Sequence, residues 1–416
     1  MSNEPTSPTR SVTIIGAGPA GLIAAETLAK AGLAVTVHDR MPSVGRKLLM
    51  AGRGGLNLTH SEPLEAFLNR YGAATGRLRP LIEAFPPSAL REWAEALGQP
   101  TFVGSSGRVF PTSLKASPLL RAWLRRLDEL GVRFVLRDDW QGFDRDRQPI
   151  FRHANGTTGT VTTDATLLAL GGASWPRLGS TGAFADLLWE RGVDMTPLRP
   201  ANVGFRVDWS EIFRGRFAGQ PLKALAIRFQ DITLRGEAMI TAYGLEGGVI
   251  YALSAPLRDA IGRDGSATVH LDLAPGRRVD ELAARIAAQK PSQSLSNRLR
   301  KAAHLSPAAI NLLREGAGGP ALPGDAEALA ALIKAVPVRL TGTEGLERAI
   351  STAGGVAWSG IDEHMMLKAL PGVFVAGEMI DWEAPTGGYL LQASFATGIA
   401  AAKGILARFG AAIGAG

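Results

Sequence analysis

The sequence lacks cysteine altogether, and this absence excludes several classes of redox protein. Without thiols the chain forms no disulfide, no thiolate nucleophile, no iron–sulfur cluster and no cysteine-based zinc site. Aromatic residues make up only 6% and charged residues 20%, so the composition fits neither a coiled coil nor a disordered chain. Any redox chemistry must therefore come from a bound cofactor, and we expect no metal site.

The sequence also lacks a convincing membrane span or signal peptide. Ile14–Val37 is the most apolar stretch, but it contains Glu26 and Lys30, and no basic region precedes it. We therefore expect a cytoplasmic protein without membrane contact. A length of 416 residues, of which 46% are hydrophobic, is enough for two or three domains with buried cores.

Short apolar runs and helical spacing predict a parallel α/β unit at the N-terminus. Val12–Ile15 and Val35–Val37 are predicted strands, with a helix at Leu22–Ala31 between them. Further strands are expected at Val132–Leu136 and Ala165–Leu170, and further helices at Leu81–Leu97, Leu119–Leu130 and 183–191.

The pattern changes after Pro197 and Pro200 and returns near the C-terminus. Residues 203–273 are predicted to be β-rich, whereas 279–314 and 326–335 are helical. A strand at Val373–Ala376 and a closing helix at Leu391–Arg408 restore the α/β character. We predict four segments: an α/β part at 1–195, a β-rich insertion at 196–275, a helical cap at 276–339, and the remainder of the α/β domain at 340–416.

The strongest local motif is Gly16-Ala17-Gly18-Pro19-Ala20-Gly21, which follows a predicted strand and opens a predicted helix. Asp39 stands at the end of the next strand, and this context is typical of a dinucleotide site in a Rossmann-like fold. Gly16 permits the tight turn, Gly18 lets the backbone approach a pyrophosphate, and Gly21 lets helix and strand pack closely. The helix amides favour phosphate, and Asp39 is suited to the ribose.

Two later glycine pairs favour FAD over a nicotinamide cofactor. Gly171-Gly172 ends a predicted strand, where the backbone passes close to a cofactor. Gly377-Glu378 follows another strand, and Gly387-Gly388 opens the last helix, whose N-terminus can stabilise the negative charge of a reduced flavin. No second glycine motif of this kind follows a strand, so NAD(P)H is expected only as a transient reductant.

In these and further sequence blocks the chain resembles the YhiN/BaiN-type FAD-dependent oxidoreductases, which are also described as aminoacetone oxidase-like flavoproteins. The matching blocks are Gly45-Arg46-Lys47-Leu48-Leu49-Met50 with Asn57-Leu58-Thr59, Gly107-Arg108-Val109-Phe110-Pro111 with Lys115-Ala116-Ser117, Leu170–Pro176 with Gly179–Gly182, Gly354-Gly355-Val356, and Gly377–Asp381 with Pro385–Tyr389. The resemblance implies non-covalent FAD in a domain split around a small β-barrel and a helical cap. The chain differs from the usual family pattern at Gly52–Asn57 and at Tyr389-Leu390-Leu391. These differences do not change the expected cofactor, but no family member's substrate is carried over to this chain.

Motif and resemblance together predict which residues bind FAD and which act in catalysis. The predicted cofactor-binding residues are Gly16, Gly18, Ala20, Gly21, Asp39, Arg40, Lys47, Asn57, Gly171, Gly172, Gly377, Glu378, Gly387, Gly388, Tyr389 and Leu390. For catalysis, Tyr389 is a candidate proton donor or ring-packing group, Arg53 a candidate anion holder, and His60 a candidate acid or base. Hydride transfer depends more on positioning than on acid–base groups, so a flavoenzyme need not show a conspicuous catalytic residue.

The positive charge is concentrated in one segment. Residues 276–314 hold eight basic and two acidic residues, which accounts for most of the chain's net charge of +7. This pattern fits either a solvated helical face or a surface for RNA, with Arg298, Arg300 and Lys301 as contacts. The segment has no aromatic residue for base stacking, and nothing in the sequence indicates DNA sequence readout.

Three functions are consistent with these features. The first is an FAD-dependent oxidoreductase acting on a small-molecule substrate, with NAD(P)H as donor. The second is a flavin-dependent reductase of RNA that converts uridine to dihydrouridine, an activity associated with relatives of this family, and docks through the basic segment. The third is a non-enzymatic binding protein stabilised by FAD.

Overall fold

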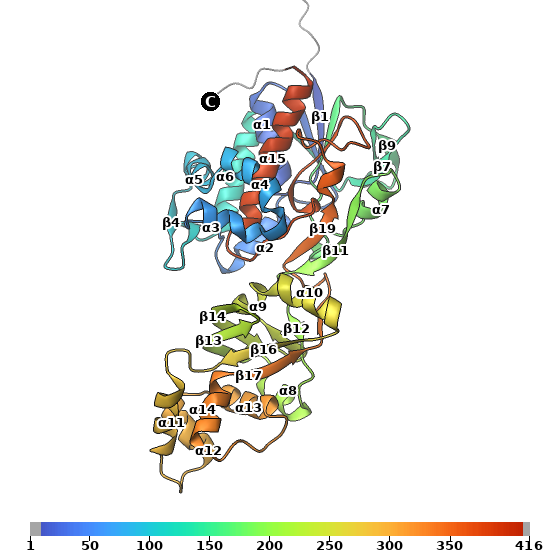
Figure 1. Cartoon of the computed structure of the whole chain (residues 1–416). Coiled ribbons are helices and arrows are strands. Elements are labelled where there is room, and N and C mark those ends of the chain that lie inside the picture. Colours follow the sequence, from blue (N-terminus) through green and yellow to red (C-terminus); the bar gives the residue numbers. More distant parts are fainter. Residues whose placement is uncertain (1–9, 411–416) are drawn as a thin grey trace, which may run out of the picture. The chain divides into compact units, whose positions relative to one another are not determined.

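A computed structural model describes residues 10–410, which divide into two units (Figure 1). The first unit ends at Arg199 and resumes at Ile350, and the second is Pro200–Ala349. The sequence placed the C-terminal boundary at 339/340. The boundary lies later because strands β17 (Val336–Leu340) and β18 (Gly342–Thr343) complete the sheet of the second unit.

The first unit is built on a five-stranded parallel sheet with the strand order β20-β10-β1-β2-β6. These strands are β1 (Ser11–Ile15), β2 (Ala34–Asp39), β6 (Arg133–Leu136), β10 (Ala165–Leu168) and β20 (Val373–Val375). β20 comes from the C-terminal part of the chain and pairs with β10, so both parts of the first unit share one sheet. The predicted α/β fold with a parallel sheet is therefore confirmed.

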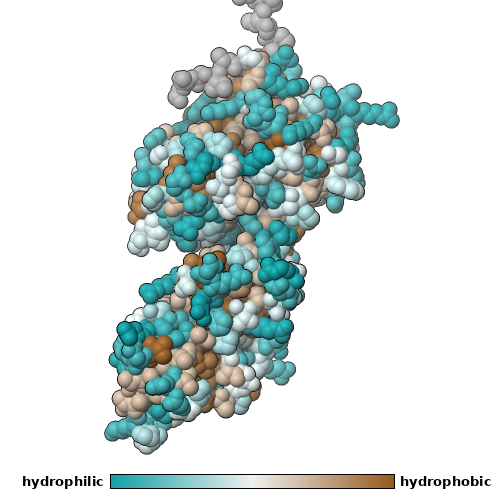
Figure 2. All heavy atoms as spheres, in the orientation of Figure 1, coloured by the Kyte–Doolittle hydropathy of each residue, from teal (hydrophilic) through white to brown (hydrophobic). Residues whose placement is uncertain are grey.

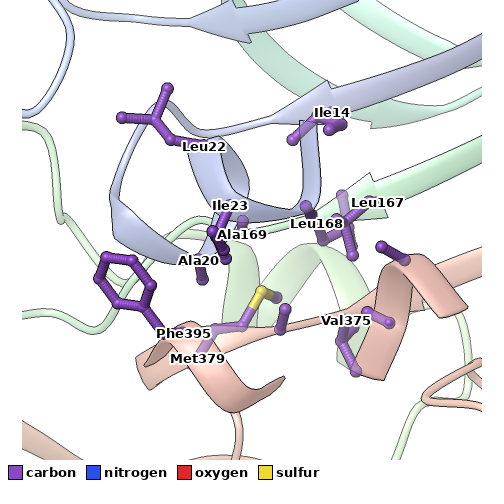
Figure 3. Close-up of a cluster of buried hydrophobic side chains, with 14 of the residues drawn as sticks. Ile14, Ala20, Leu22, Ile23, Leu167, Leu168, Ala169, Val375, Met379 and Phe395 are labelled. Carbon is purple, nitrogen blue, oxygen red and sulfur yellow. The ribbon is translucent and has the colours of Figure 1, made fainter. Parts of the chain in front are cut away.

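Helices α1 (Pro19–Lys30) and α15 (Tyr389–Arg408) pack closely against each other beside this sheet. A Cβ atom at Gly398 would lie 2.5 Å from the carbonyl oxygen of Ala20, so the contact requires glycine. Figure 3 shows Ala20, Leu22 and Ile23 of α1 gathered with Leu167, Val375 and Phe395 in the hydrophobic core. Among the described residues, α15 is long and apolar enough to cross a membrane. However, 67% of its most apolar 18-residue stretch is buried within the protein.

A buried carboxylate anchors α1 to two further helices, α5 (Pro87–Ala96) and α6 (Ala116–Glu129). Glu26 is 1% exposed and accepts hydrogen bonds from the indoles of Trp93 (3.1 Å) and Trp123 (2.8 Å). It also pairs with Lys30 at 2.7 Å and Arg126 at 3.1 Å. Burial acts to raise the pKa of Glu26, but the hydrogen bonds from Lys30 and Trp93 outweigh it, and the net shift is downward.

The predicted helix Leu81–Leu97 is wrong as a single element. The chain forms α4 (Thr75–Ala84) and then α5, and the break falls at Phe85 and Pro86. Pro86-Pro87 lacks two backbone donors, and proline disfavours a helical conformation in the residue before it. Phe85 accordingly leaves the helical region, with φ −142° and ψ 78°.

The remaining elements of the first unit form short sheets and helices around the core. The small sheets are β3-β5-β4, β7-β8-β9 and β11-β19, made of β3 (Thr59–His60), β4 (Thr101–Val103), β5 (Arg108–Pro111), β7 (Asp139–Phe143), β8 (Pro149–Arg152), β9 (Thr158–Thr160), β11 (Met195–Ala201) and β19 (Ser351–Val356). The further helices are α2 (Arg46–Ala51), α3 (Leu64–Leu68), α7 (Phe184–Trp189) and the 3₁₀ turns η1 (Gly52–Gly54), η2 (Asn69–Ala74), η3 (Pro176–Leu178), η4 (Trp358–Gly360) and η5 (Gly377–Met379).

The second unit is built on a seven-stranded antiparallel sheet with the order β17-β16-β13-β14-β15-β12-β18. Its other strands are β12 (Phe205–Arg206), β13 (Pro221–Phe229), β14 (Ile232–Ile240), β15 (Gly244–Glu246) and β16 (Ala267–Asp272). The edge strands β17 and β18 are separated in the chain by Thr341 alone. The two edges therefore meet, and the sheet curls as expected of a small barrel.

Seven helices complete the second unit: α8 (Glu211–Phe217), α9 (Gly248–Tyr251), α10 (Ser254–Asp264), α11 (Val279–Ala287), α12 (Leu295–Ala303), α13 (Pro307–Gly316) and α14 (Ala326–Lys334). The predicted helical stretch 279–314 is three of these helices. Ser294 and Ser306 begin α12 and α13, and each accepts a hydrogen bond from an amide of the new helix. Figure 2 shows hydrophilic residues interspersed with apolar ones on the visible faces of both units.

Candidate active site

The carboxyl ends of the parallel strands in the first unit border a cavity of about 680 Å³. In parallel α/β sheets this edge is where ligands bind. Thirteen residues predicted to bind the cofactor line this cavity: Gly16, Gly18, Ala20, Asp39, Arg40, Lys47, Asn57, Gly171, Gly377, Glu378, Gly387, Gly388 and Leu390. The cavity therefore brings together residues from both sequence parts of the first unit.

The glycines after β1 have distinct structural roles. Gly16 has φ +111°, and a Cβ there would lie 2.2 Å from the carbonyl oxygen of Ala169. A Cβ at Gly21 would lie 2.0 Å from the carbonyl oxygen of Gly16, so both positions require glycine for packing. Gly18 has nothing within 4 Å of its Cβ position, and its missing side chain leaves open space. This arrangement fits a pyrophosphate approaching the backbone at Gly18.

Asp39 lies at the end of β2 with its carboxylate held in place. It accepts hydrogen bonds from the amides of Ala17 and Met41, both at 2.8 Å. Burial raises the pKa of Asp39, and these two hydrogen bonds oppose that shift only in part. Because the side chain lines the cavity next to the Gly16–Gly21 turn, it fits a ribose hydroxyl.

The N-terminus of α15 opens onto the same cavity. Gly388 has φ +94°, and a Cβ there would lie 2.5 Å from Cα of Thr59, so this close approach requires glycine. No side chain caps α15 or α1, and each helix begins after a glycine that lines the cavity. The free amides of two helix N-termini suit a pyrophosphate and the electron-rich edge of a flavin. These residues therefore fit FAD.

An ion pair inside the cavity joins residues 331 positions apart. The ammonium of Lys47 lies 2.9 Å from Oε2 of Glu378 and donates to Oγ of Ser174 at 3.0 Å. Glu378 also accepts hydrogen bonds from the amides of Thr352 (3.0 Å) and Gly172 (3.3 Å). The network holds a positive charge at a defined place in the cavity wall, and it explains why Gly172, which does not itself line the cavity, lies close to it.

Tyr389 and His60 lie together in a cluster next to the start of α15. The Tyr389 hydroxyl donates to Oε1 of Glu62 at 2.6 Å, and Arg70 pairs with the same carboxylate at 2.7 Å. Burial raises the pKa of Tyr389, and the Glu62 hydrogen bond raises it further. The His60 and Tyr389 rings stack with centroids 5.7 Å apart.

Neither Tyr389 nor His60 lines the cavity. Nε2 of His60 is 3.0 Å from the Ser106 carbonyl oxygen, and its Nδ1 accepts from the Glu62 amide. Both ring nitrogens are therefore engaged. The side chain of Arg53 lies outside the described residues. Roles in catalysis for these three residues stay predictions.

Many residues without a predicted role in cofactor binding also line the cavity, among them Arg46, Arg108, Trp175 and Ile350. Arg46, Arg108 and Trp175 belong to the sequence blocks that carry the family resemblance. The resemblance could therefore have pointed to these residues, but it gave them no specific role. Within residues 10–410 no group of three or more His, Asp or Glu side chains is arranged so that it could hold a metal ion.

Comparisons with known proteins agree with this site. The family described as HI0933-like protein Rossmann domain matches residues 10–404. The 3-dehydro-bile acid delta(4,6)-reductase of Clostridium scindens is 25% identical over 94% of this chain and 98% of its own length. The ribosomal RNA dihydrouridine synthase of Escherichia coli is 25% identical over 95% of this chain and 97% of its own length.

A solved structure shares the fold. The 3-ketosteroid delta1-dehydrogenase of Sterolibacterium denitrificans has a TM-score of 0.52 and 12% identity, covering 96% of this chain and all of the other. The family match spans nearly the whole described chain and includes the cavity. The chain therefore belongs to the HI0933-like family, the YhiN/BaiN type that its motifs resemble, and it is an FAD-dependent oxidoreductase.

Proposed function

We propose that the protein reduces a carbon–carbon double bond conjugated to a carbonyl group in a small organic substrate, with NAD(P)H as the electron donor. The names of the two relatives share this chemistry, because a 3-oxo compound with 4,6 double bonds and a uracil ring both contain such a bond. We place the reaction in the cytoplasm, as the composition indicates. Neither relative's own substrate is assigned to this chain.

The observation that carries the proposal is that two uncapped helix N-termini face one cavity. The amides at the start of α1, with Gly18 and Asp39, would hold the pyrophosphate and ribose of FAD. Those at the start of α15, with Gly387 and Gly388, would lie against the flavin ring. FAD held by these residues would supply hydride-transfer chemistry, so that the double bond would gain a hydride on one carbon and a proton on the other.

The Lys47–Glu378 ion pair adds a cation and an anion to the cavity wall. The ammonium of Lys47 would stabilise negative charge on the cofactor or on a substrate carbonyl. Glu378 receives two backbone hydrogen bonds and so holds Lys47 without free rotation. NAD(P)H would bind transiently, because the sequence contains no second dinucleotide motif after a strand.

Anaerobic half-reactions test this proposal. Protein reconstituted with FAD is mixed with NADH or NADPH while the flavin absorbance is followed, and then with a neutral 3-oxo-4-ene steroid. We expect bleaching by one nicotinamide, reoxidation by the steroid, and a product with two added hydrogens. A saturated 3-oxo steroid is the control acceptor. Absence of FAD binding, or no reoxidation of the reduced flavin by the 3-oxo-4-ene steroid, would contradict the proposal.

RNA remains a second candidate substrate because of the basic segment in the second unit. Of its eight basic residues, Arg277 and Arg278 form ion pairs with Glu281 and Asp280. No ion pair is found for Arg298, Arg300 or Lys301 within the described residues, and Arg300 and Lys301 are exposed. Such unpaired cations attract phosphates.

Charge reversal separates this candidate from the first. Changing Arg298, Arg300 and Lys301 to Glu should abolish binding of a uridine-containing RNA and leave FAD content unchanged. The matched control reverses Arg263, Arg277 and Arg278, which already pair with acidic neighbours, and should weaken RNA binding far less. Equal effects of the two triple variants, or no RNA binding by the wild type at moderate salt, would exclude docking through this segment.

A further inference from the structure

The proposed reaction needs a proton donor, and the side chains of the cavity wall restrict which group can act as one. The double bond gains a hydride on one carbon and a proton on the other. Tyr389 and His60, the acids predicted from the sequence, do not line the cavity. The chain has no cysteine that could replace them. A side-chain donor must therefore be one of the titratable groups that do line the cavity.

The four carboxylates of the cavity wall already act as hydrogen-bond acceptors. Asp39 accepts an amide hydrogen on each oxygen. Asp138 has an imidazole nitrogen at each oxygen, at 2.6 and 2.5 Å. Asp139 pairs with two arginines, and Glu378 accepts from one ammonium and two amides. An ionised carboxylate only accepts, so none of the four has a proton to give.

His38 also lines the cavity, but it has no proton to release there. Its Nδ1 lies 2.6 Å from the Asp138 carboxylate, so this nitrogen carries the proton of the neutral ring. Its Nε2 is buried and has no hydrogen-bond partner among the described residues. Burial lowers the pKa of His38, which favours the neutral ring. The arginines of the wall, Arg40, Arg46 and Arg108, do not give up their protons in proteins.

Lys47 is the one titratable side chain left among the described residues that line the cavity, and it has a donor to spare. An ammonium has three N–H bonds. Two of them are directed at Oε2 of Glu378, at 2.9 Å, and at Oγ of Ser174, at 3.0 Å. No third partner is found within residues 10–410, and the side chain is 26% exposed. One N–H bond of Lys47 is therefore available to a ligand.

Both partners of this ammonium are held by the same buried threonine. Thr352 is 0% exposed, and its Oγ1 accepts a hydrogen bond from the amide of Ser174 at 3.1 Å. The amide of Thr352 donates to Glu378 at 3.0 Å. The Ser174 hydroxyl donates to the Ile350 carbonyl oxygen at 3.2 Å, so its lone pairs remain for Lys47. The direction of the ammonium is therefore fixed before a substrate binds.

We propose that Lys47 is the catalytic acid and gives a proton to the carbon next to the substrate carbonyl. This inference rests on the proposed function and names the proton donor that the reaction requires. An Nζ–H bond of Lys47 breaks and a C–H bond forms at that carbon, while the other carbon of the double bond receives the hydride. The neutral amine then takes a proton from water, which its exposed side allows. Glu378 and Ser174 are positioning residues.

The first test measures whether the ammonium reaches a ligand, without turnover. Pentafluorophenolate, an anionic ring that resembles an enolate, is titrated into the oxidised holoprotein by calorimetry. We expect Lys47→Ala to bind it about 10-fold more weakly than the wild type, and Lys47→Arg to bind it about as tightly, because arginine keeps the charge. Lys403→Ala, half-buried on α15 and outside the cavity, is the control. Equal binding by wild type and Lys47→Ala would overturn the proposal.

The second test separates proton transfer from charge. Reduced holoprotein is mixed anaerobically with the 3-oxo-4-ene steroid while reoxidation of the flavin is followed. Lys47→Ala and Lys47→Arg should both be reoxidised at least ~100-fold more slowly than the wild type, because neither side chain gives up a proton. Reduction by the nicotinamide should slow far less, since it needs no proton from Lys47. A wild-type rate of reoxidation in Lys47→Arg would assign Lys47 a role through charge alone and overturn the proposal.

Rescue by added amines removes the dependence on how arginine fits. Methylammonium should restore part of the lost rate to Lys47→Ala, because it brings a proton into the space that the lysine leaves. Tetramethylammonium carries the same charge without an N–H bond and should restore nothing. Equal rescue by both ions, or none by methylammonium while FAD affinity stays at the wild-type value, would contradict the proposed role.

Failure of this inference differs from failure of the proposed function. If the steroid reoxidises the wild type and both Lys47 variants equally fast, the inference fails and the proposed reaction stands. If the steroid does not reoxidise the wild type, the proposed reaction is itself wrong, and the inference fails with it.

Discussion

Four helices of the second unit begin differently from three helices that line the cavity of the first unit. In the second unit α8, α12, α13 and α14 begin at Ser210, Ser294, Ser306 and Asp325, and each of these side chains accepts a hydrogen bond from an amide of the first turn. In the first unit α1, α2 and α15, three of the helices that line the cavity, begin at Gly18, Gly45 and Gly388 without a side-chain cap.

The difference in capping indicates the function of the glycines that precede α1, α2 and α15. An uncapped helix leaves amide donors unsatisfied, and a side-chain cap contributes about 1 kcal/mol. The second unit uses serine and aspartate to obtain that stabilisation from its own side chains. At the cavity the chain forgoes it, so the amides stay available for an anionic cofactor. Helices α4, α5 and α6 also lack a side-chain cap but do not line the cavity, so the feature that marks α1, α2 and α15 is the cavity-lining glycine before each of them.

The largest expected effect comes from removing the anchor that holds uncapped α1. In Glu26→Ala the ion pairs and both indole hydrogen bonds are lost, and Arg126 keeps a partly buried charge without its carboxylate. We expect a loss of about 3–5 kcal/mol in the free energy of unfolding, measured by urea denaturation. Glu129→Ala, on the neighbouring helix α6, is the control.

The same anchor predicts a pH dependence. Because the folded-state pKa of Glu26 is lowered, its contribution is present above the unfolded-state pKa and is lost as pH falls below it toward the folded-state value. Wild type and Glu26→Gln should therefore differ most near neutral pH and converge in acid. A stability difference that grows as pH falls would contradict this account.

A side-chain cap introduced at the start of α1 should make this helix resemble the capped helices of the second unit and should weaken cofactor binding. Gly18 has an extended conformation, φ −86° and ψ −179°, and open space at its Cβ, so Gly18→Asp would cap α1 without a clash. We expect stability without FAD to be unchanged or slightly higher, and FAD affinity to fall at least ~100-fold, because the carboxylate repels pyrophosphate. Fluorescence titration and thermal melts measure both.

The matched control is Gly76→Asp, in the first turn of α4, where the glycine is also open and exposed. It adds the same charge to a helix that does not line the cavity, so FAD affinity should not change. If Gly18→Asp binds FAD as well as the wild type, the first turn of α1 is not the phosphate site.

A smaller effect is expected at the ribose end. Asp39→Asn should weaken FAD binding by about 10- to 100-fold, since hydrogen bonds to a charged group are lost. Burial raises the pKa of Asp39, so wild-type affinity should fall as pH drops, beginning above the ordinary aspartate range. Asp39→Asn should lose this dependence, whereas Asp128→Asn on α6 should keep it. An unchanged pH profile in Asp39→Asn would argue against this role.

The smallest effect is expected for a cap in the second unit. Ser306→Ala removes the hydrogen bond to the Ala309 amide and should cost about 1 kcal/mol in the unfolding of that unit, with no change in FAD affinity. Ser292→Ala, at an exposed position outside the helices, should cost less. A loss of FAD binding in Ser306→Ala would break the separation between the two kinds of helix start.

Much of the cofactor site could be predicted from the sequence, because its glycine turns are local. Gly16 and Gly388 adopt positive φ in short turns, and such positions are recognisable from spacing and from flanking strands and helices. The split between α4 and α5 is also local, because Pro86-Pro87 marks it. The helical spacing of Leu81–Leu97 taken alone predicts one helix, and that prediction is wrong.

Other features depend on contacts between distant parts of the chain. The Lys47–Glu378 pair forms only because β20 joins β10 in the sheet, and no local pattern specifies this. Tyr389 follows the glycine pair in sequence, yet its side chain hydrogen-bonds to Glu62 and does not line the cavity. The backbone of Leu114, with φ +57°, likewise has no sequence signature, because leucine is not expected in the left-handed region.

Hydrogen exchange with and without FAD tests the central comparison most directly. Exchange of the amides at residues 18–22 and 388–392 should slow strongly when FAD binds, because the cofactor satisfies them. Amides at residues 294–298 and 306–310, already capped by serine, should show no change. Equal slowing at all four helix starts, or no slowing at α1 and α15, would contradict the account.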